Sequence, residues 1–116
     1  MEIIIHTPQS AVELTASGGG NPSNTSPACA VSEARFLVFT VIHNLTGSNS
    51  TSLDAIIYAS HDGTTFDTEP YASLNIGANK VKTIPVSPGI YRVKIKVQNN
   101  DAANATKVTT KLTLSK

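Results

Sequence analysis

The sequence has little of what usually marks a catalytic or disulfide-stabilised protein. Its 116 residues include one cysteine and no tryptophan, and only six are Phe or Tyr. A single cysteine excludes an intramolecular disulfide, so burial and strand pairing must stabilise the fold. Charged residues make up 15% of the chain. No apolar run approaches the roughly 20 residues that a membrane-spanning helix needs, and we therefore expect no membrane association.

Sequence patterns of common enzyme chemistry are also absent. There is no G-x-S-x-G, P-loop or G-x-G-x-x-G motif. The three histidines, His6, His43 and His61, lack ligand-like spacing, and Cys29 has no coupled histidine. The sequence therefore predicts a protein that is not an enzyme and binds no metal or other cofactor.

One turn carries a cluster of three carboxylates: Asp62, Asp67 and Glu69. Carboxylates in a loop can bind calcium, but this spacing does not fit an EF-hand loop. We interpret the cluster as a solvated acidic loop.

The residues that are abundant favour β-structure. Thr and Val pack well on a pleated surface, while Ser, Asn and Gly are common in turns. Residues 91–97, YRVKIKV, alternate apolar and basic side chains strictly, as expected of a half-buried strand. Residues 34–45, ARFLVFTVIHNL, are apolar on both faces, which predicts a central or doubly covered strand. The full set of expected strands is 2–5, 9–17, 34–45, 53–60, 72–76, 80–86, 91–97 and 105–115.

About seven or eight strands without a helix predict an all-β fold, a single antiparallel β-sandwich. The pattern leaves open whether the sandwich is immunoglobulin-like or a jelly roll. The length predicts one domain spanning residues 1–116. Within it, residues 18–27, GGGNPSNTSP, are expected to form a flexible Gly/Pro/Ser-rich loop or arm without regular structure.

Charge is distributed unevenly along the chain. Residues 1–79 contain one basic and seven acidic residues, a net charge of −6, whereas residues 80–116 contain eight basic and one acidic residue, a net charge of +7. Because consecutive strands are usually neighbours, we expect the last three strands to present one basic strip. The strip comprises Lys80, Lys82, Arg92, Lys94, Lys96, Lys107 and Lys111.

Three roles for this strip compete. Lysines on outer strands discourage edge-to-edge aggregation. A basic strip also complements an acidic surface on a protein partner and would steer its docking. Finally, seven cations could bind nucleic acid, but no aromatic residue interleaves with them in the sequence to stack on bases, which disfavours this role.

Four segments follow one another in a distinctive order within residues 53–115. They are an apolar strand with an S-x-D-G-x-x-F turn at 56–66, K-x-I-P-V at 82–86, I-Y-R-V-K-I-K-V at 90–97 and a Thr-rich strand at 106–114. This order resembles small β-sandwich proteins of tailed-phage virions. The resemblance implies a non-enzymatic viral structural protein that works by binding a repeated lattice.

In that case the chain is expected to be a capsid cement or decoration protein, or a tail or neck component. The resemblance implies a homo-oligomer, a dimer or trimer, whose partner is the major capsid protein or another virion protein. It also implies assembly into the virion after synthesis in the host cytoplasm. Similar strings occur in immunoglobulin- and fibronectin-like modules, so a binding module for carbohydrate or a host surface is the alternative. Its candidate contact residues are Tyr58, Phe66 and Tyr71.

Overall fold

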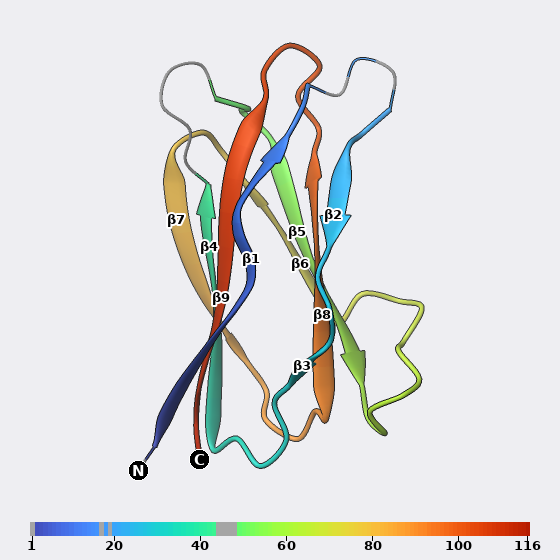
Figure 1. Ribbon diagram of the computed structural model, residues 1–116, viewed down its shortest axis with the longest axis vertical. Helices are drawn as coiled ribbons and strands as arrows, with labels where there is room; N and C mark the ends of the chain where they lie inside the picture. The colour runs from blue at the N-terminus through green and yellow to red at the C-terminus, as the bar shows by residue number, and fades with distance from the viewer. Residues whose placement is uncertain (1, 17, 19, 44–48) are drawn as a thin grey trace.

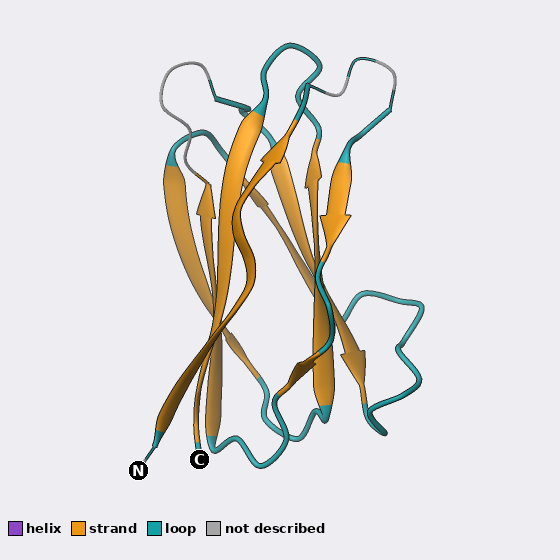
Figure 2. Cartoon of the chain, in the orientation of Figure 1, coloured by secondary structure: helices purple, strands orange, loops and turns teal. Residues whose placement is uncertain are grey.

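The computed structural model describes residues 2–16, 18, 20–43 and 49–116. These residues form an all-β sandwich of two antiparallel sheets (Figures 1 and 2). In chain order the strands are β1 (Ile3–Leu14), β2 (Ser23–Thr25), β3 (Cys29–Ala30), β4 (Phe36–His43), β5 (Leu53–Ser60), β6 (Ala72–Ile76), β7 (Lys80–Val86), β8 (Arg92–Asn99) and β9 (Thr106–Ser115). The all-β sandwich expected from the sequence is confirmed.

Strand pairing identifies the sandwich as a jelly roll. Sheet I has the order β1-β9-β4-β7, and sheet II has the order β2-β8-β5-β6 with β3 also on β8. The first strand thus pairs with the last, β2 and β3 with β8, β4 with β7, and β5 with β6, all antiparallel. Such nested pairing is that of one long hairpin rolled into two sheets. It decides between the two connectivities that the sequence left open.

The core lies between the two sheets and follows the period-2 alternation of the sequence. In β8 the residues Val93, Ile95 and Val97 are fully buried, while the basic residues between them face outward. Strand β4 is central in sheet I, as predicted from its two apolar faces. Its inward side chains Leu37, Phe39 and Val41 are buried in the core.

Two segments differ from the sequence-based expectation. Residues 2–5 and 9–17 were expected as separate strands, but β1 runs from Ile3 to Leu14 with two register shifts against β9, which accommodate the interruption at Pro8. The segment 18–27 was expected to lack regular structure, yet Ser23–Thr25 pairs with β8 as β2. This short strand fits between Pro22 and Pro27, because proline is tolerated at the ends of an edge strand.

Some expectations fall on residues outside the described ranges. These are the last two residues of the predicted strand 34–45, the first part of the loop that follows it, and Ser17 and Gly19.

Candidate partner-binding surface

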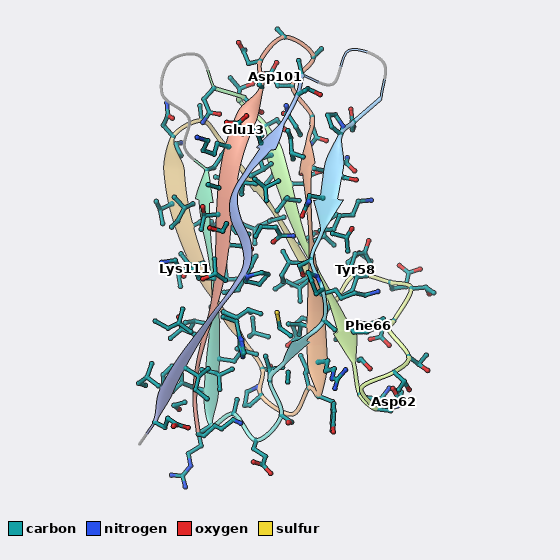
Figure 3. All side chains as sticks on the ribbon, in the orientation of Figure 1. Glu13, Tyr58, Asp62, Phe66, Asp101 and Lys111 are labelled. Carbon is teal, nitrogen blue, oxygen red and sulfur yellow. The ribbon has the colours of Figure 1, made fainter. Side chains whose placement is uncertain are left out.

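The predicted single basic strip is wrong, because the structure divides its residues between the two sheets. Strands β7 and β9 flank β4 in sheet I, whereas β8 lies in sheet II. The chain crosses from one sheet to the other between β7 and β8 and again between β8 and β9, so proximity in sequence does not make these three strands neighbours. Figure 3 shows the result: Lys111 of β9 lies on one side of the sandwich and Tyr58, opposite Lys94 of β8, on the other.

Lys80 and Lys82 do not lie on an outer sheet face either. Lys82 pairs with Val41 and Lys80 with His43, and both partners point into the core. Directly paired residues point to the same side of a sheet, so these lysines occupy the core side of the edge strand β7, where their side chains are exposed. Inward charges on an edge strand protect it from pairing with another sheet.

The remaining basic residues of sheet I belong to β9. Lys107 Nζ lies 3.5 Å from Glu13 Oε1 of β1, and the two side chains form a surface ion pair. Lys111 faces outward from the middle of the strand, opposite Thr40. These two lysines are therefore separated from the basic residues of β8 by the thickness of the sandwich.

Sheet II carries the candidate site, which we call the β8 basic face. It consists of Arg92, Lys94 and Lys96 on β8 together with the aromatic side chains of Tyr58 and Phe66. Tyr58 on β5 lies directly opposite Lys94. Phe66, from the loop after β5, places its ring centroid 4.2 Å from Lys94 Nζ, a distance typical of a cation–π contact.

A tight turn brings Phe66 onto this face. The Asp62 carboxylate accepts hydrogen bonds from the backbone N–H groups of Thr64 and Thr65 at 2.9 and 2.8 Å, and from the Ser60 hydroxyl. These bonds stabilise the carboxylate and hold the pKa of Asp62 well below its usual range. Further along, the Asp67 N–H donates to the Ala59 carbonyl at 2.9 Å. The loop is thus tied back to β5 on both sides of Phe66.

The aromatic contacts correct one step of the sequence analysis. No aromatic residue interleaves with the basic residues along the chain, but the fold places Tyr58 and Phe66 beside Lys94. Phe66 and Lys94 are 28 positions apart, and no local pattern signals their contact. The observation removes the argument that disfavoured nucleic acid, and it strengthens the case that β8 forms a contact surface.

The β8 basic face has cations available for a partner. Within the described ranges, no carboxylate lies at ion-pair distance from Arg92, Lys94 or Lys96. The face also has apolar area, because the half-buried Ile56 lies opposite Lys96 on β5. A surface of this kind can bind an acidic partner through charge and aromatic packing together.

A separate hollow of about 170 Å³ lies where the loop after β5 meets the turn before β8. It is lined by Ala59, Ser60, His61, Asp67, Tyr71, Gly89 and Ile90. The Tyr71 hydroxyl accepts a hydrogen bond from the Ser87 N–H at 3.1 Å. The three aromatic residues suggested for carbohydrate binding are therefore divided: Tyr71 lines this hollow, while Tyr58 and Phe66 belong to the β8 basic face.

The described part of the chain offers no cluster of three or more His, Cys, Asp or Glu side chains that could hold a metal ion. Cys29 is half-buried, and burial raises the pKa of its thiol. Within the same ranges no helix is long and apolar enough to cross a membrane.

Comparison with known proteins shows similarity in fold. No protein-family model matches the sequence, and no curated protein matches it. Among solved structures, the chain is similar to a protein chain in the structure of infectious bursal disease virus, Gx strain, with a TM-score of 0.63 and 13% identity over 97% of this chain. It is also similar to the enzymatically active domain of bacteriophage CBA120 tailspike protein 4, with a TM-score of 0.67 and 15% identity over 97% of the chain.

These two matches cover only part of the larger proteins, 31% of the bursal disease virus chain and 18% of the tailspike chain. A third structure is comparable in length. The SPBc2 prophage-derived protein YomS matches with a TM-score of 0.54 and 18% identity over 98% of this chain and 94% of its own. The chain therefore shares its fold with proteins of viral and phage origin.

Proposed function

We propose that this chain is a non-enzymatic structural protein of a virion, most specifically a capsid cement or decoration protein. It attaches to the major capsid protein, or to another virion protein, through the β8 basic face. Many identical copies on a lattice then turn individually weak contacts into stable attachment.

The observation that carries the proposal is the β8 basic face itself. Cations that pair with no carboxylate of the described residues lie beside aromatic rings on the outer face of sheet II, a composition suited to a protein–protein contact. The fold is consistent with this role, because jelly rolls occur in viral capsid domains, and so is the similarity to structures of viral and phage origin.

The proposal is tested with particles of the virus that encodes the chain. Particles are stripped of the protein, incubated with purified tagged protein over a series of salt concentrations, and re-isolated. We expect saturable binding with a fixed number of copies per particle that weakens as salt rises, because salt screens charge pairs. Absence of the chain from purified particles, together with failure to rebind, would contradict the proposal.

Nucleic acid is the competing partner for the same face. A fluorescent poly-dT oligonucleotide provides the probe, because stacking on aromatic rings tolerates any base sequence. We expect only weak binding that physiological salt abolishes. Tight binding that is lost on replacing Phe66 with Ala would assign the face to single-stranded nucleic acid instead.

The hollow beside Tyr71 favours a second candidate function, carbohydrate binding, since jelly rolls also form lectin domains. It combines an aromatic ring with the polar side chains of His61 and Asp67 in about 170 Å³. A glycan-array screen with the purified chain tests this function. A hit that is lost with Asp67→Ala would support it, and no hit across the array would leave the structural role as the better account.

A further inference from the structure

The outer face of sheet I is unusually apolar for a surface. Of the large apolar side chains that are at least 40% exposed, four lie on this face: Ile3 (50%), Ile5 (58%), Phe36 (40%) and Val81 (63%). Contiguous apolar surface of this kind commonly marks a protein–protein contact. The residues between them on this face include threonines and Lys111. The hydroxyl oxygens of Thr40 and Thr83 lie 2.9 Å apart.

Strand register shows that three of these residues, Ile3, Ile5 and Phe36, lie in two continuous rows across the sheet. One row runs Ile3–Ser115–Phe36 across β1, β9 and β4. The next row runs Ile5–Thr113–Val38–Pro85 and reaches β7. Neither row contains a charged residue. We call these two rows the apolar rows. Val81 lies in a separate row with Ile42 and Thr109, beyond the row that contains Lys111.

We propose that the apolar rows form the interface of a homodimer, in which the outer faces of sheet I from two copies of this chain pack against each other. The dimer contact does not depend on the proposed function, but its use in bridging a lattice rests on it.

The distribution of charge favours the outer face of sheet I over that of sheet II for contact with a second copy of the chain. The outer face of sheet II cannot pack against itself, because Arg92, Lys94 and Lys96 would meet the same residues of the other copy. On sheet I, Lys107 pairs with Glu13, and Lys111 is the basic residue of β9 that lies beside the apolar rows on the outer face. Arg35 and Lys116 are the chain neighbours of Phe36 and Ser115 at the end of the first row. Edge-to-edge pairing through β7 is also blocked, since Lys80 and Lys82 lie on its core side.

Lys111 does not prevent a twofold contact. It lies three residues along β9 from Leu114, which is midway between the two rows, a distance of about 10 Å in a strand. If the strands of the two copies run antiparallel about an axis at this midpoint, the apolar rows face each other and the two Lys111 side chains lie about 20 Å apart along the strand. This separation exceeds the Debye length of about 8 Å at physiological salt, and each Lys111 lies beyond the apolar rows of the other copy.

The size of the face predicts a reversible dimer. Four strands spaced about 4.8 Å apart and about eight residues long cover roughly 500 Å² in projection. Stable interfaces bury roughly 800 Å² of accessible surface on each partner. The contact is therefore smaller than a stable interface, and the dimer should dissociate on dilution.

Such a dimer would place the two β8 basic faces on its opposite outer surfaces. Each dimer could then contact two neighbouring subunits of a lattice, which increases overall affinity without a new type of contact. A cement protein with this geometry would link adjacent subunits.

The test is the mass of the full-length protein in solution, measured by sedimentation velocity over a concentration series. We expect a reversible increase from the monomer mass of 12.2 kDa to twice that value, with little dependence on salt because the contact is apolar. The variant Ile5→Lys/Phe36→Lys should remain monomeric at every concentration. The matched control, Thr25→Lys/Ser73→Lys, adds the same charge to exposed positions on the outer face of sheet II and should dimerise as wild type does.

Cross-linking supplies a second readout that does not depend on a disruptive substitution. Packed sheet faces lie about 10 Å apart, too far for a disulfide, so a short bismaleimide is used in a Cys29→Ser background. Thr113→Cys should give cross-linked dimers, and Ser73→Cys should give none. A wild-type protein that stays monomeric at all concentrations, or a dimer that survives the Ile5→Lys/Phe36→Lys substitutions, would overturn the proposal. Neither result would bear on attachment through the β8 basic face.

Discussion

At the scale of single residues, the hydrogen bonding and the pKa of a buried polar side chain depend on the groups around it, as His43 shows. His43 is fully buried at the end of β4, and its Nδ1 donates to the Gly77 carbonyl at 2.9 Å. Its Nε2 is buried and has no hydrogen-bond partner among the residues that the structure describes. Burial opposes protonation of the ring and lowers the pKa of His43, although the bond to Gly77 acts in the opposite direction.

We predict that His43 makes the fold less stable in mild acid. Because its pKa is lower in the folded than in the unfolded state, where it is about 6.5, its contribution is present above pH 6.5 and is lost as the pH falls below that value. Urea unfolding between pH 7.5 and 5 measures this effect, whose slope cannot exceed about 1.4 kcal/mol per pH unit for one proton. His43→Gln should flatten the profile in this window, while His61→Gln, at an exposed position, should leave it unchanged. A profile that is already flat in the wild type would contradict the prediction.

Gly63 is the position where the turn before Phe66 requires glycine. Its φ angle is +87°, and a Cβ at this position would lie 2.7 Å from Cδ1 and Cε1 of Tyr91. We predict that Gly63→Ala lowers the free energy of unfolding by about 1–3 kcal/mol, through backbone strain and the clash with Tyr91. Chemical denaturation measures the loss.

The control for Gly63 is Gly77→Ala. A Cβ at Gly77 would have its nearest neighbour, Lys80 Nζ, at 3.7 Å, which is ordinary contact, so this variant should unfold close to wild type. Equal stability of the two variants would show that the turn tolerates a side chain.

At the scale of elements, β1 joins the two sheets through one side chain. Gln9 is buried between the register shifts of β1, and its Nε2 donates to the Ile95 carbonyl of β8 at 2.7 Å. Its Oε1 accepts a hydrogen bond from the Thr110 hydroxyl of β9. The shifts that interrupt the pairing of β1 with β9 thus place an amide where it bridges sheets I and II.

We predict that Gln9→Ala destabilises the fold by about 1–3 kcal/mol, because it leaves buried groups without hydrogen-bond partners. Thermal or urea unfolding gives the value. Ser10→Ala is the control. Ser10 follows Gln9 in β1 and its side chain is exposed, so removal of its hydroxyl should have little effect. Hydrogen exchange should also increase in β1 of the Gln9 variant, and unchanged protection there would argue against the bridging role.

The sequence predicts the strands better than their arrangement. Strict alternation located β8, because Val93, Ile95 and Val97 are buried and the residues between them are basic. The same reasoning failed for β7, where Lys82 shares the core side with Ile84 and Val81 is the most exposed large apolar residue in the described part of the chain. At an edge strand the core side is only partly covered, so a lysine can lie there. The alternation of apolar and basic residues then no longer indicates which side of the strand faces the core.

The candidate site could be predicted only in part for a related reason. Arg92, Lys94 and Lys96 were identified by their spacing along one strand, which a strand face preserves. Their separation from Lys107 and Lys111 depends on strand connectivity, and their contact with Phe66 depends on a loop folding back across sheet II. Neither leaves a periodic signal in the sequence.

At the scale of the whole molecule, the sandwich has two faces of different character. The outer face of sheet I presents the apolar rows. That of sheet II presents the β8 basic face, whose Tyr58 and Phe66 are labelled in Figure 3. The charge asymmetry along the sequence therefore does not become two oppositely charged surfaces, because basic residues occur on both sheets and Asp62 lies near Phe66 on the same side as the β8 basic face.

The central claim is attachment through the β8 basic face, and the most direct measurement is the occupancy of stripped particles by two matched charge-reversal variants. Lys94→Glu/Lys96→Glu and Lys80→Glu/Lys82→Glu change the net charge equally, but the first alters the β8 basic face and the second the edge strand β7. We expect the first variant to bind at least about tenfold more weakly than wild type, as truncating charged contacts costs more than about 1.4 kcal/mol, and the second to bind nearly as wild type. Equal binding by both variants would contradict the account.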